Sequence, residues 1–363
     1  MILGEKKQMK KIGAFFREFF IDGLTGMAQG LFATLIIGTI IVQIGSWIPG
    51  QFGGYILLMG KVATALTGAG IGCGVAVKFK ASPLVTLSAV VTGMTGAFAT
   101  QILAGSVFVD GVMHFTGPGE PLGAFLAAVS GIYVGRLISG KTRLDIILTP
   151  FVCILTGATV GLLLGPPIST FMNKIGDLIA LGTQQAPFLM GIIVSVLMGM
   201  ALTLPISSAA LGVILNLSGI AAGAATVGCC ANMVGFAVAS YQDNKWNGLL
   251  AQGLGTSMLQ MGNIVKKPTI WLPAIISSAI MGPISTMIFK FQNNAVGSGM
   301  GTAGLVGPIN AYNTMVETGL DPALAILEVL LLCFVLPGLF AWGVALVMRR
   351  WKWLKPGDMK LES

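Results

Sequence analysis

The sequence predicts an all-α protein that crosses a membrane many times. Hydrophobic residues make up 55% of the 363 residues and charged residues only 9%, whereas a soluble domain has about 25% charged residues. The mean hydropathy is +0.87. The apolar residues also fall into a series of separate runs, and a helix of about 20 such residues crosses a bilayer. Little sequence is left for a soluble domain, so a catalytic or regulatory domain would have to come from another chain.

The net charge of +8 is explained by membrane topology and not by nucleic-acid binding. Basic residues gather at the two ends of the chain and in short loops between apolar runs, which places both termini in the cytoplasm. We expect residues 1–22 to form an amphipathic helix on the inner leaflet and residues 351–363 to be a short cytoplasmic tail. The membrane domain then covers residues 23–350, and its number of full crossings is even.

About ten transmembrane helices fit between these ends. They are expected near residues 24–46, 54–77, 83–106, 121–139, 145–165, 186–203, 206–221, 223–241, 269–289 and 322–348.

Two further stretches, 247–265 and 293–316, are rich in Gly and amide side chains and too broken to be full spans. Backbone that is not helical at membrane depth is tolerated where protein or a water-filled cavity satisfies its polar groups. We therefore predict two re-entrant hairpins whose tips meet near the middle of the membrane. The alternative is that both are interfacial loops.

The first hairpin carries the strongest candidate site. Its uncharged polar residues lie among glycines, which let the backbone turn and approach a ligand closely. Amides and hydroxyls both donate and accept hydrogen bonds, as sugar hydroxyls do. The alternative role is hydrogen bonding between helices, at about 1 kcal/mol per contact. The candidate residues of this hairpin are Gln252, Thr256, Ser257, Gln260 and Asn263.

Asn232 is a second candidate, because a lone amide in an uncharged span needs a partner. Ser207, Ser208 and Asn216 are further candidates in the same uncharged region, where Pro205, close to the two Ser residues, frees backbone groups.

The second hairpin offers further candidate ligands for a solute, namely Asn310, Asn313 and Glu317. His114, the single His of the chain, and Glu120 lie in a predicted external loop, where they could titrate or bind a sugar. A solvated loop is the alternative for both.

The sequence predicts no metal site, no cofactor and no catalytic nucleophile. The five Cys residues all lie in apolar segments without metal-ligand spacing, so we interpret them as small buried residues. No phosphate-binding loop or basic soluble module is present that would indicate nucleotide or DNA binding.

Several long strings resemble a known family. They are LTLPISSAALGVILNLSGIAAGAATVGCCANMVGFAVASY, GLGTSMLQMGNIVKKP, GMGTAGLVGPIN, PLGAFLAA at 121–128 and GKTRLDIILTP at 140–150. The chain is similar, from about Gly23 to Arg350, to stand-alone membrane proteins grouped with enzyme IIC of the bacterial phosphotransferase system. Some of these proteins carry the name perfringolysin O regulator protein.

This resemblance implies a dimer in the bacterial inner membrane, with a scaffold part and a mobile transport part that contains the hairpins. In sugar-transporting IIC proteins a His and a Glu of a Gly-x-x-Glu-Pro motif bind the sugar. Gly117–Pro121 is similar to that motif, but it lies in the first half of the chain and not in a later hairpin.

The leading functional hypothesis is therefore a IIC-type permease that carries a polar solute, a sugar or sugar derivative, by alternating access. If transport is coupled to phosphorylation, separate IIB and IIA chains supply the phosphate, and this chain is at most the IIC subunit. Two alternatives remain open at this point. One is a membrane sensor that regulates genes through a partner, and the other is a proton-coupled transporter that uses Glu317 or Glu120.

Overall fold

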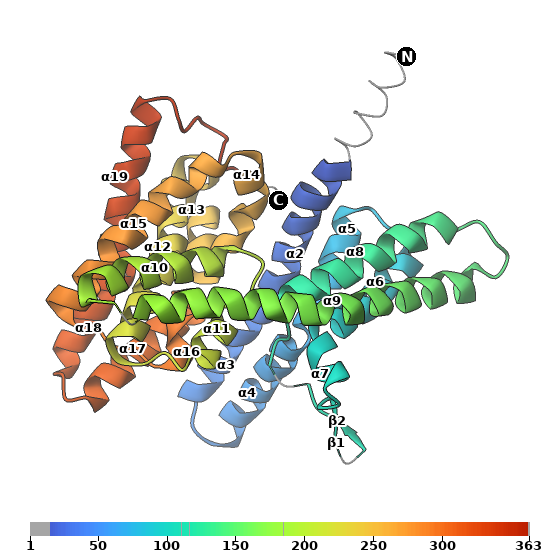
Figure 1. Ribbon diagram of the computed structural model, residues 1–363, viewed down its shortest axis with the longest axis horizontal. Coiled ribbons are helices and arrows are strands. Elements are labelled where there is room, and N and C mark those ends of the chain that lie inside the picture. The colour runs from blue at the N-terminus through green and yellow to red at the C-terminus, as the bar shows by residue number, and fades with distance from the viewer. Residues whose placement is uncertain (1–14, 110, 116, 184, 362–363) are drawn as a thin grey trace. The chain divides into compact units, whose positions relative to one another are not determined.

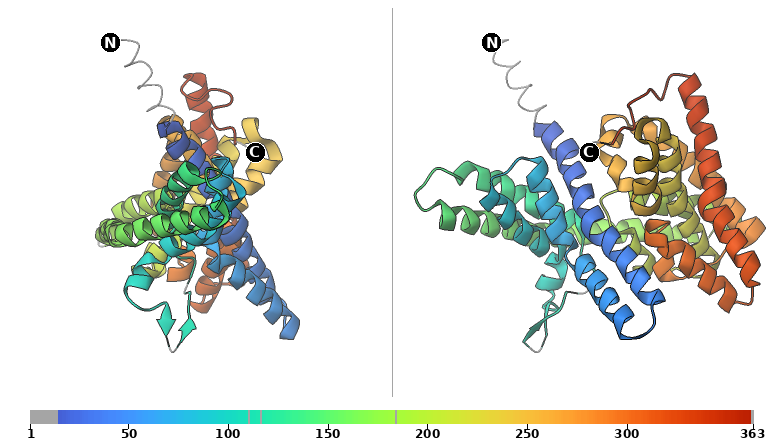
Figure 2. Two further views of the ribbon diagram at one scale, coloured as in Figure 1. Left: turned by 90° about the vertical axis from the view of Figure 1, so that its right-hand side faces the viewer. Right: turned by 180° about the vertical axis from the view of Figure 1, so that it is seen from behind.

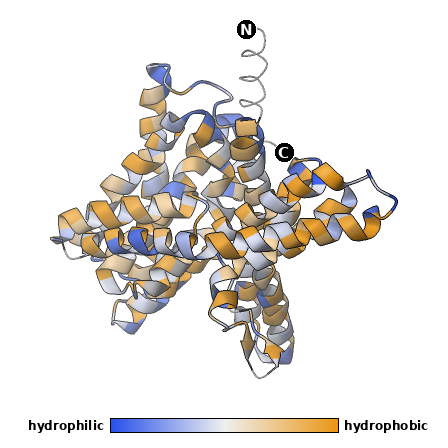
Figure 3. Cartoon of the chain, turned by 45° about the vertical axis from the view of Figure 1, so that its right-hand side comes forward, coloured by the Kyte–Doolittle hydropathy of each residue, from blue (hydrophilic) through white to orange (hydrophobic). Residues whose placement is uncertain are grey.

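The computed structural model describes residues 15–109, 111–115, 117–183 and 185–361. Helices dominate this part of the chain (Figure 1), which confirms the all-α prediction apart from one short β-hairpin. Hydrophobic residues run along much of most helices, while many of the hydrophilic residues lie at helix ends and in the connecting segments (Figure 3). This distribution is the one expected for helices surrounded by lipid.

The chain forms two compact units. Unit 1 comprises Met1–Leu35 and Val62–Ser169, and unit 2 comprises Ile36–Lys61 and Thr170–Ser363. The chain therefore passes from one unit to the other after Leu35, Lys61 and Ser169.

Unit 1 is a helical cluster around α5 and α8. Its elements are η1 (Glu18–Gly23), α2 (Leu24–Leu31), α5 (Thr67–Lys78), α6 (Pro83–Ala97), α7 (Ala99–Leu103), β1 (Phe108–Val109), β2 (Val112–Met113), α8 (Pro121–Ile138) and the first part of α9 (Asp145–Thr183). The η2 turn (Phe32–Ile36) leads from unit 1 into unit 2.

Glycines set the spacing of the helices in unit 1. A Cβ atom at Gly30 would collide with the backbone of Gly70, and one at Gly93 would collide with the backbone of Gly68. The same relation holds at the crossing of α6 and α8, where Gly96 faces Gly123. Small residues on both sides allow such close backbone contact in membrane proteins, which accounts for part of the high Gly content.

The predicted loop before α8 contains a small antiparallel hairpin that the sequence did not predict. Phe108 pairs with Met113, and Val109 pairs with Val112. Gly111 lies at the turn with φ of +76°, a conformation that favours glycine.

Unit 2 contains the longest buried helix and most of the broken ones. Its elements are α3 (Ile37–Trp47), most of α4 (Gly50–Ala65), the last part of α9, α10 (Pro187–Thr203), α11 (Ser208–Ile214), α12 (Gly219–Ala239), α13 (Tyr241–Leu250), η3 (Ala251–Gly255), η4 (Ser257–Gln260), α14 (Met261–Lys266), η5 (Pro268–Trp271), α15 (Leu272–Pro283), η6 (Ile284–Phe289), α16 (Ala295–Ser298), η7 (Ala303–Leu305), α17 (Val306–Glu317), α18 (Pro322–Leu330), η8 (Leu331–Val335) and α19 (Leu336–Arg350).

Helix α12 is the centre of unit 2. Nearly all of its residues are buried, and α10, α15 and α19 pack around it (Figure 1). Its glycines again allow close crossings, because a Cβ atom at Gly228 would collide with the carbonyl oxygen of Ser195 on α10. Helix α10 meets α15 in the same way through Gly191 and Gly282.

The structure confirms apolar helices long enough to cross a membrane, but it does not confirm the predicted count of about ten. In the described residues, six helices are long and apolar enough to cross a membrane, or seven if α4 and α5 together form one bent span. The six run over Phe15–Trp47, Pro121–Ile138, Asp145–Thr183, Gly219–Ala239, Pro268–Phe289 and Pro322–Arg350. Pro83–Ala97 and Pro187–Thr203 are apolar but shorter.

Two predicted boundaries are wrong. The expected span 206–221 is only a seven-residue helix, α11, because the chain turns at Asn216 with φ of +47° before α12 begins. The expected end near residue 165 is also wrong. Helix α9 continues through Pro166 and Pro167 to Thr183, and Pro within membrane helices is tolerated when neighbouring groups satisfy the freed carbonyls.

The predicted N-terminal amphipathic helix falls largely on residues 1–14, which lie outside the described part of the chain. From Phe15 onwards the chain is helical as far as Trp47.

Gly228→Ala should destabilise the protein by about 1–3 kcal/mol, because the added methyl group has to push α10 away from α12. The measurement is the melting temperature of the purified protein in detergent. Gly343→Ala is the matched control, since no atom lies within 4 Å of a Cβ atom at this helical position. An equal effect of the two substitutions would contradict the close-packing account.

Candidate functional site

The first predicted hairpin is a chain of short elements in unit 2. Helix α13 has a break at Lys245, where φ is +52° and ψ is −148°. The π-helical turn η3, the 3₁₀ turn η4 and the short helix α14 follow. The Thr256 hydroxyl accepts a hydrogen bond from the Met258 N–H at the start of η4. No element from α13 to α14 reaches the length of a membrane span, as predicted for this stretch.

Four buried side chains form a connected row, which we call the amide row: Ser240, Gln252, Gln260 and Asn263. Ser240 lies at the end of α12, and the other three lie in residues 247–265. Gln252 Nε2 donates to Ser240 Oγ at 2.9 Å, and Gln260 Nε2 donates to Gln252 Oε1 at 2.9 Å. Asn263 Nδ2 then donates to Gln260 Oε1 at 2.8 Å. The first three residues are completely buried and Asn263 is 9% exposed. The structure therefore brings together three of the predicted binding residues.

The amide row also binds the C-terminal segment. Gln260 Nε2 donates to the carbonyl oxygen of Met359 at 2.9 Å, and Asn263 Nδ2 donates to that of Lys360 at 2.9 Å. The chain returns from the end of α19 to reach this position beside α14 (Figures 1 and 2). These donors are thus already paired with acceptors of the same protein.

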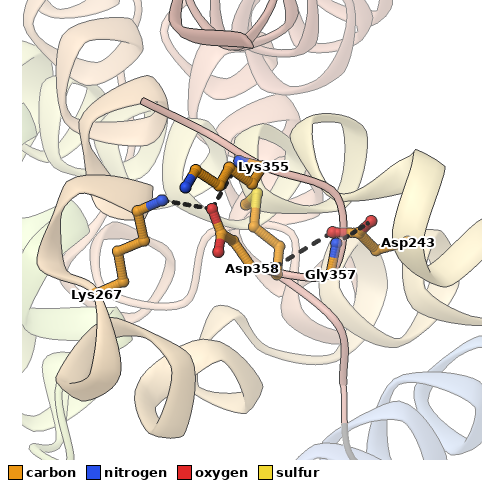
Figure 4. Close-up of polar contacts among 6 residues, drawn as sticks. Asp243, Lys267, Lys355, Gly357 and Asp358 are labelled. Atoms are coloured by element: carbon orange, nitrogen blue, oxygen red, sulfur yellow. Dashed lines mark hydrogen bonds and ion pairs between the residues drawn. The ribbon is translucent and has the colours of Figure 1, made fainter. Parts of the chain in front are cut away.

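Charged groups fix the segment from both sides (Figure 4). Lys267 Nζ lies 2.5 Å from Asp358 Oδ2, and the Asp243 carboxylate accepts hydrogen bonds from the N–H groups of Gly357 and Met359. Partial burial raises the pKa of Asp358, but hydrogen bonds from Lys267 and the Lys355 N–H outweigh it and hold the pKa below its ordinary value. Because the folded-state pKa is lowered, this contact stabilises the protein above the ordinary carboxyl pKa and is lost as the pH falls through the lowered one.

Asn232 lies in a second polar cluster, at the crossing of α10, α12 and α15. Its Oδ1 accepts from Trp271 Nε1 at 2.9 Å and from Thr203 Oγ1 at 3.2 Å. Its Nδ2 donates to Ser278 Oγ at 3.0 Å. Thr203 Oγ1 lies 2.8 Å from Ser257 Oγ, so the cluster also contacts the start of η4. The lone amide therefore has the partners that the sequence required, and they are helix-packing partners.

The second predicted hairpin contains its own amide cluster. Asn293 Nδ2 donates to Thr226 Oγ1 on α12 at 2.7 Å, and Asn294 Nδ2 donates to Asn310 Oδ1 at 3.0 Å. The two broken segments touch where Thr302 Oγ1 donates to the carbonyl oxygen of Gly253 at 2.5 Å. Asn310 is thus the predicted residue of this hairpin that joins a network.

Other predicted residues lie apart from these networks. Asn313, Glu317, Asn216 and His114 are exposed. Ser208 is buried and donates to the carbonyl oxygen of Gly299 at 2.6 Å, and Ser207 is 8% exposed.

Glu120 in unit 1 differs from the other predicted residues because one of its oxygens lacks a partner. Its Oε1 is buried without a hydrogen bond from the described residues, directly before α8 begins at Pro121. Burial raises the pKa of Glu120 to about 7, although a hydrogen bond with the Leu122 backbone opposes this shift.

Sequence reasoning missed Asp243, Asn244 and Ser240, which contribute to the amide row or bind the tail. Asn244 Nδ2 donates to the Met359 carbonyl at 2.7 Å, and its Oδ1 accepts from the Leu361 N–H at 2.8 Å. One signal was present, because Asp243 is the first charged residue after the long uncharged segment 178–242. Nothing in the sequence indicated that residues 357–361 would return to it.

The amide row offers uncharged hydrogen-bonding groups. The amide row contains no carboxylate, His or thiol, and Cys229 and Cys230 are completely buried in α12. No group of three His, Cys, Asp or Glu side chains among the described residues could hold a metal ion. Uncharged donors and acceptors of this kind suit a neutral polar ligand.

The fold and the site together define a polytopic α-helical membrane protein with broken, amide-rich segments inside one of its units. A comparison with protein families agrees with this class. The family model of the phosphotransferase system EIIC domain matches residues 21–361. The chain therefore belongs to the phosphotransferase system EIIC family and is a membrane permease of the IIC type. A search of curated proteins found no match.

Asn232→Ala should lower stability by about 1–2 kcal/mol, because the Trp271 and Thr203 donors lose their buried acceptor. The melting temperature in detergent measures this change. Gln51→Ala is the control, since it removes an exposed amide that donates to Tyr55. Trp271→Phe in the Asn232→Ala background should cost less than in the wild type, and additive losses would contradict the proposed hydrogen bond.

Proposed function

We propose that this IIC permease binds a sugar or sugar derivative on the amide row and carries it inward by alternating access. The observation that carries the proposal is the pair of donors, Gln260 Nε2 and Asn263 Nδ2, aimed together at main-chain carbonyl oxygens. Sugar hydroxyl oxygens also accept hydrogen bonds, so the same donors can hold them. The absence of charge within the row favours a neutral solute over a sugar acid.

The broken helices support a transport role for unit 2. We propose that residues 247–265 and 293–316 are re-entrant hairpins and that unit 2 is the mobile transport part, with unit 1 as the scaffold. The contact of Thr302 with Gly253 brings the two broken segments together, and substrate sites of transporters commonly lie at discontinuous helices. Side-chain caps by Thr256 and Asn294 satisfy backbone groups that a broken helix exposes.

Phosphate would come from separate chains. A cytoplasmic IIB protein, itself supplied by IIA, would phosphorylate the sugar held on the amide row, while this chain positions the reacting hydroxyl. Lys266 and Lys267 follow the row directly and suit the approach of a phosphate-carrying partner. We propose accordingly that the protein lies in the inner membrane of a bacterium with both termini in the cytoplasm. We further propose that it works as a homodimer and that it is one of the perfringolysin O regulator-like IIC proteins.

Gln260→Ala and Asn263→Ala should each abolish the stabilisation that a bound sugar gives. A ligand at 100 times its dissociation constant stabilises the native state by about 2.7 kcal/mol, which shifts a melt. The measurement is the melting temperature of the purified protein against a panel of sugars, polyols, sugar acids and their phosphates. Gln51→Ala is the matched amide control. An unchanged shift in both variants would overturn the assignment of the amide row.

Flux separates a permease from a sensor. Uptake of the sugar identified in the panel is measured in inside-out and right-side-out vesicles, with and without a phosphorylated IIB protein. Uptake that depends on phosphorylated IIB supports the proposed coupling. Binding without flux would instead favour a membrane sensor that acts through a partner.

Proton-coupled transport is a second candidate, which the partnerless, buried oxygen of Glu120 favours. A carboxyl with a pKa of about 7 is protonated below that pH and ionised above it, so it can exchange a proton near neutrality. Glu120→Gln should then abolish the change in uptake rate between pH 6 and pH 8. A pH profile that Glu120→Gln leaves intact excludes this role for Glu120.

A further inference from the structure

The last described residues form a segment that docks on unit 2 and that no functional role yet explains. Helix α19 ends at Arg350, and the chain then turns back towards α13 and α14 (Figure 2). Trp351 and Trp353 remain 62% and 52% exposed, whereas Leu354 is 3% exposed and Met359 is completely buried. The tail is therefore anchored by the buried side chains of Leu354 and Met359, and polar contacts hold the residues around Met359.

The protein recognises the main chain of this segment, which we call the strap (residues 357–361). Asp243 accepts from the N–H groups of Gly357 and Met359. Asn244 binds Met359 and Leu361 with both ends of its amide. Gln260 and Asn263 complete the set on the carbonyl groups of Met359 and Lys360. Side chains from three separate elements thus converge on one short peptide.

One charge pair adds selectivity for this particular segment. Lys267 contacts Asp358, and their side chains are 31% and 21% exposed. Ion pairs that remain partly exposed contribute roughly 0–1 kcal/mol, and each neutral hydrogen bond contributes about 1 kcal/mol. The strap is therefore held by several modest contacts, and a competing ligand can displace it.

The strap occupies the donors on which the proposed solute site depends. Gln260 and Asn263 point their amide nitrogens at the strap's carbonyl oxygens, so these donors are not free for a solute while the strap is bound. Because the strap belongs to the same chain, its effective concentration at the site is high.

We propose that the strap is an autoinhibitory segment that must leave the amide row before solute can bind there. This proposal rests on the proposed function, because it takes the amide row as the solute site. The apparent affinity for solute then falls in proportion to the fraction of molecules whose strap is released. Any event that frees the strap, such as the docking of a cytoplasmic partner on Lys267, raises that affinity.

Cysteine labelling tests whether the strap is docked and reversible. Met359→Cys in the full-length protein should react with a water-soluble maleimide at least tenfold more slowly than Trp353→Cys, its exposed neighbour in the tail. The wild type, in which Cys73 is partly exposed, supplies the background rate. Equal rates at the two positions would overturn the proposal.

A charge exchange tests the contact that holds the strap. Asp358→Lys should raise the labelling rate of Met359→Cys about tenfold, and adding Lys267→Asp should restore slow labelling. A second measurement avoids the cavity that Met359→Cys creates. A fluorescent peptide of residues 356–363 should bind the full-length Asp358→Lys protein and should not bind the wild type, whose own strap fills the site. Failure of the peptide to bind the variant would contradict docking of the strap on the amide row.

Solute affinity decides whether the docked strap is inhibitory. Each compound of the sugar panel is titrated into the wild type and into Asp358→Lys, and the variant should bind the active compound about tenfold more tightly. The labelling assay shows whether the strap is docked in the wild type and released in Asp358→Lys. If it is, equal affinities of the two proteins for the compound would overturn the inhibitory role and leave the proposed function standing. Absence of binding in both proteins would overturn the proposed function, and the inhibitory role with it.

Discussion

The hydrogen-bonding requirement of Asn232 holds the centre of unit 2 together. This side chain is completely buried, where an amide without partners would cost several kcal/mol. Its partners come from α10, from η5 before α15 and from α15 itself, through Thr203, Trp271 and Ser278. Because Thr203 also contacts Ser257, the same requirement fixes η4 against the helices. Movement of this segment therefore has to exchange these bonds for others.

Glycines make this polar centre possible. Ser195 and Gly228 come into backbone contact because position 228 has no side chain, and this close approach brings the short polar side chains within reach of one another. In a bilayer, where apolar surface alone does not drive helices together, van der Waals contact and interhelical hydrogen bonds supply the attraction. The glycines and the uncharged polar residues of this chain are thus two parts of one packing arrangement.

The amide side chains of the row explain how the strap could occupy a proposed solute site. A Gln or Asn amide nitrogen binds a peptide carbonyl oxygen and a sugar hydroxyl oxygen by the same kind of hydrogen bond. A site built to hold a neutral polar solute is therefore open to occupation by the protein's own backbone. Lys267 and Asp243, at the edge of the amide row, distinguish the strap by its Asp358 carboxylate and its N–H groups. On the proposed function, charge at the rim and neutrality within the row would allow the strap and a solute to share one set of donors.

The sequence by itself determined the membrane class, the helical fold, the broken character of residues 247–265 and 293–316, and several of the polar residues that join buried networks. These features follow from composition and local pattern, since apolar runs of sufficient length become helices and glycine-rich polar runs interrupt them. Asn232 could even be predicted to need partners, because the requirement belongs to the residue. Which atoms would meet that requirement was decided only by the tertiary structure. The contacts of Gln260 and Asn263 with Met359 and Lys360 join residues almost 100 positions apart, and no local pattern encodes such a meeting. The length of α9 was likewise not predictable from its Pro residues alone, because Pro is tolerated within a membrane helix where the surroundings satisfy the freed backbone groups.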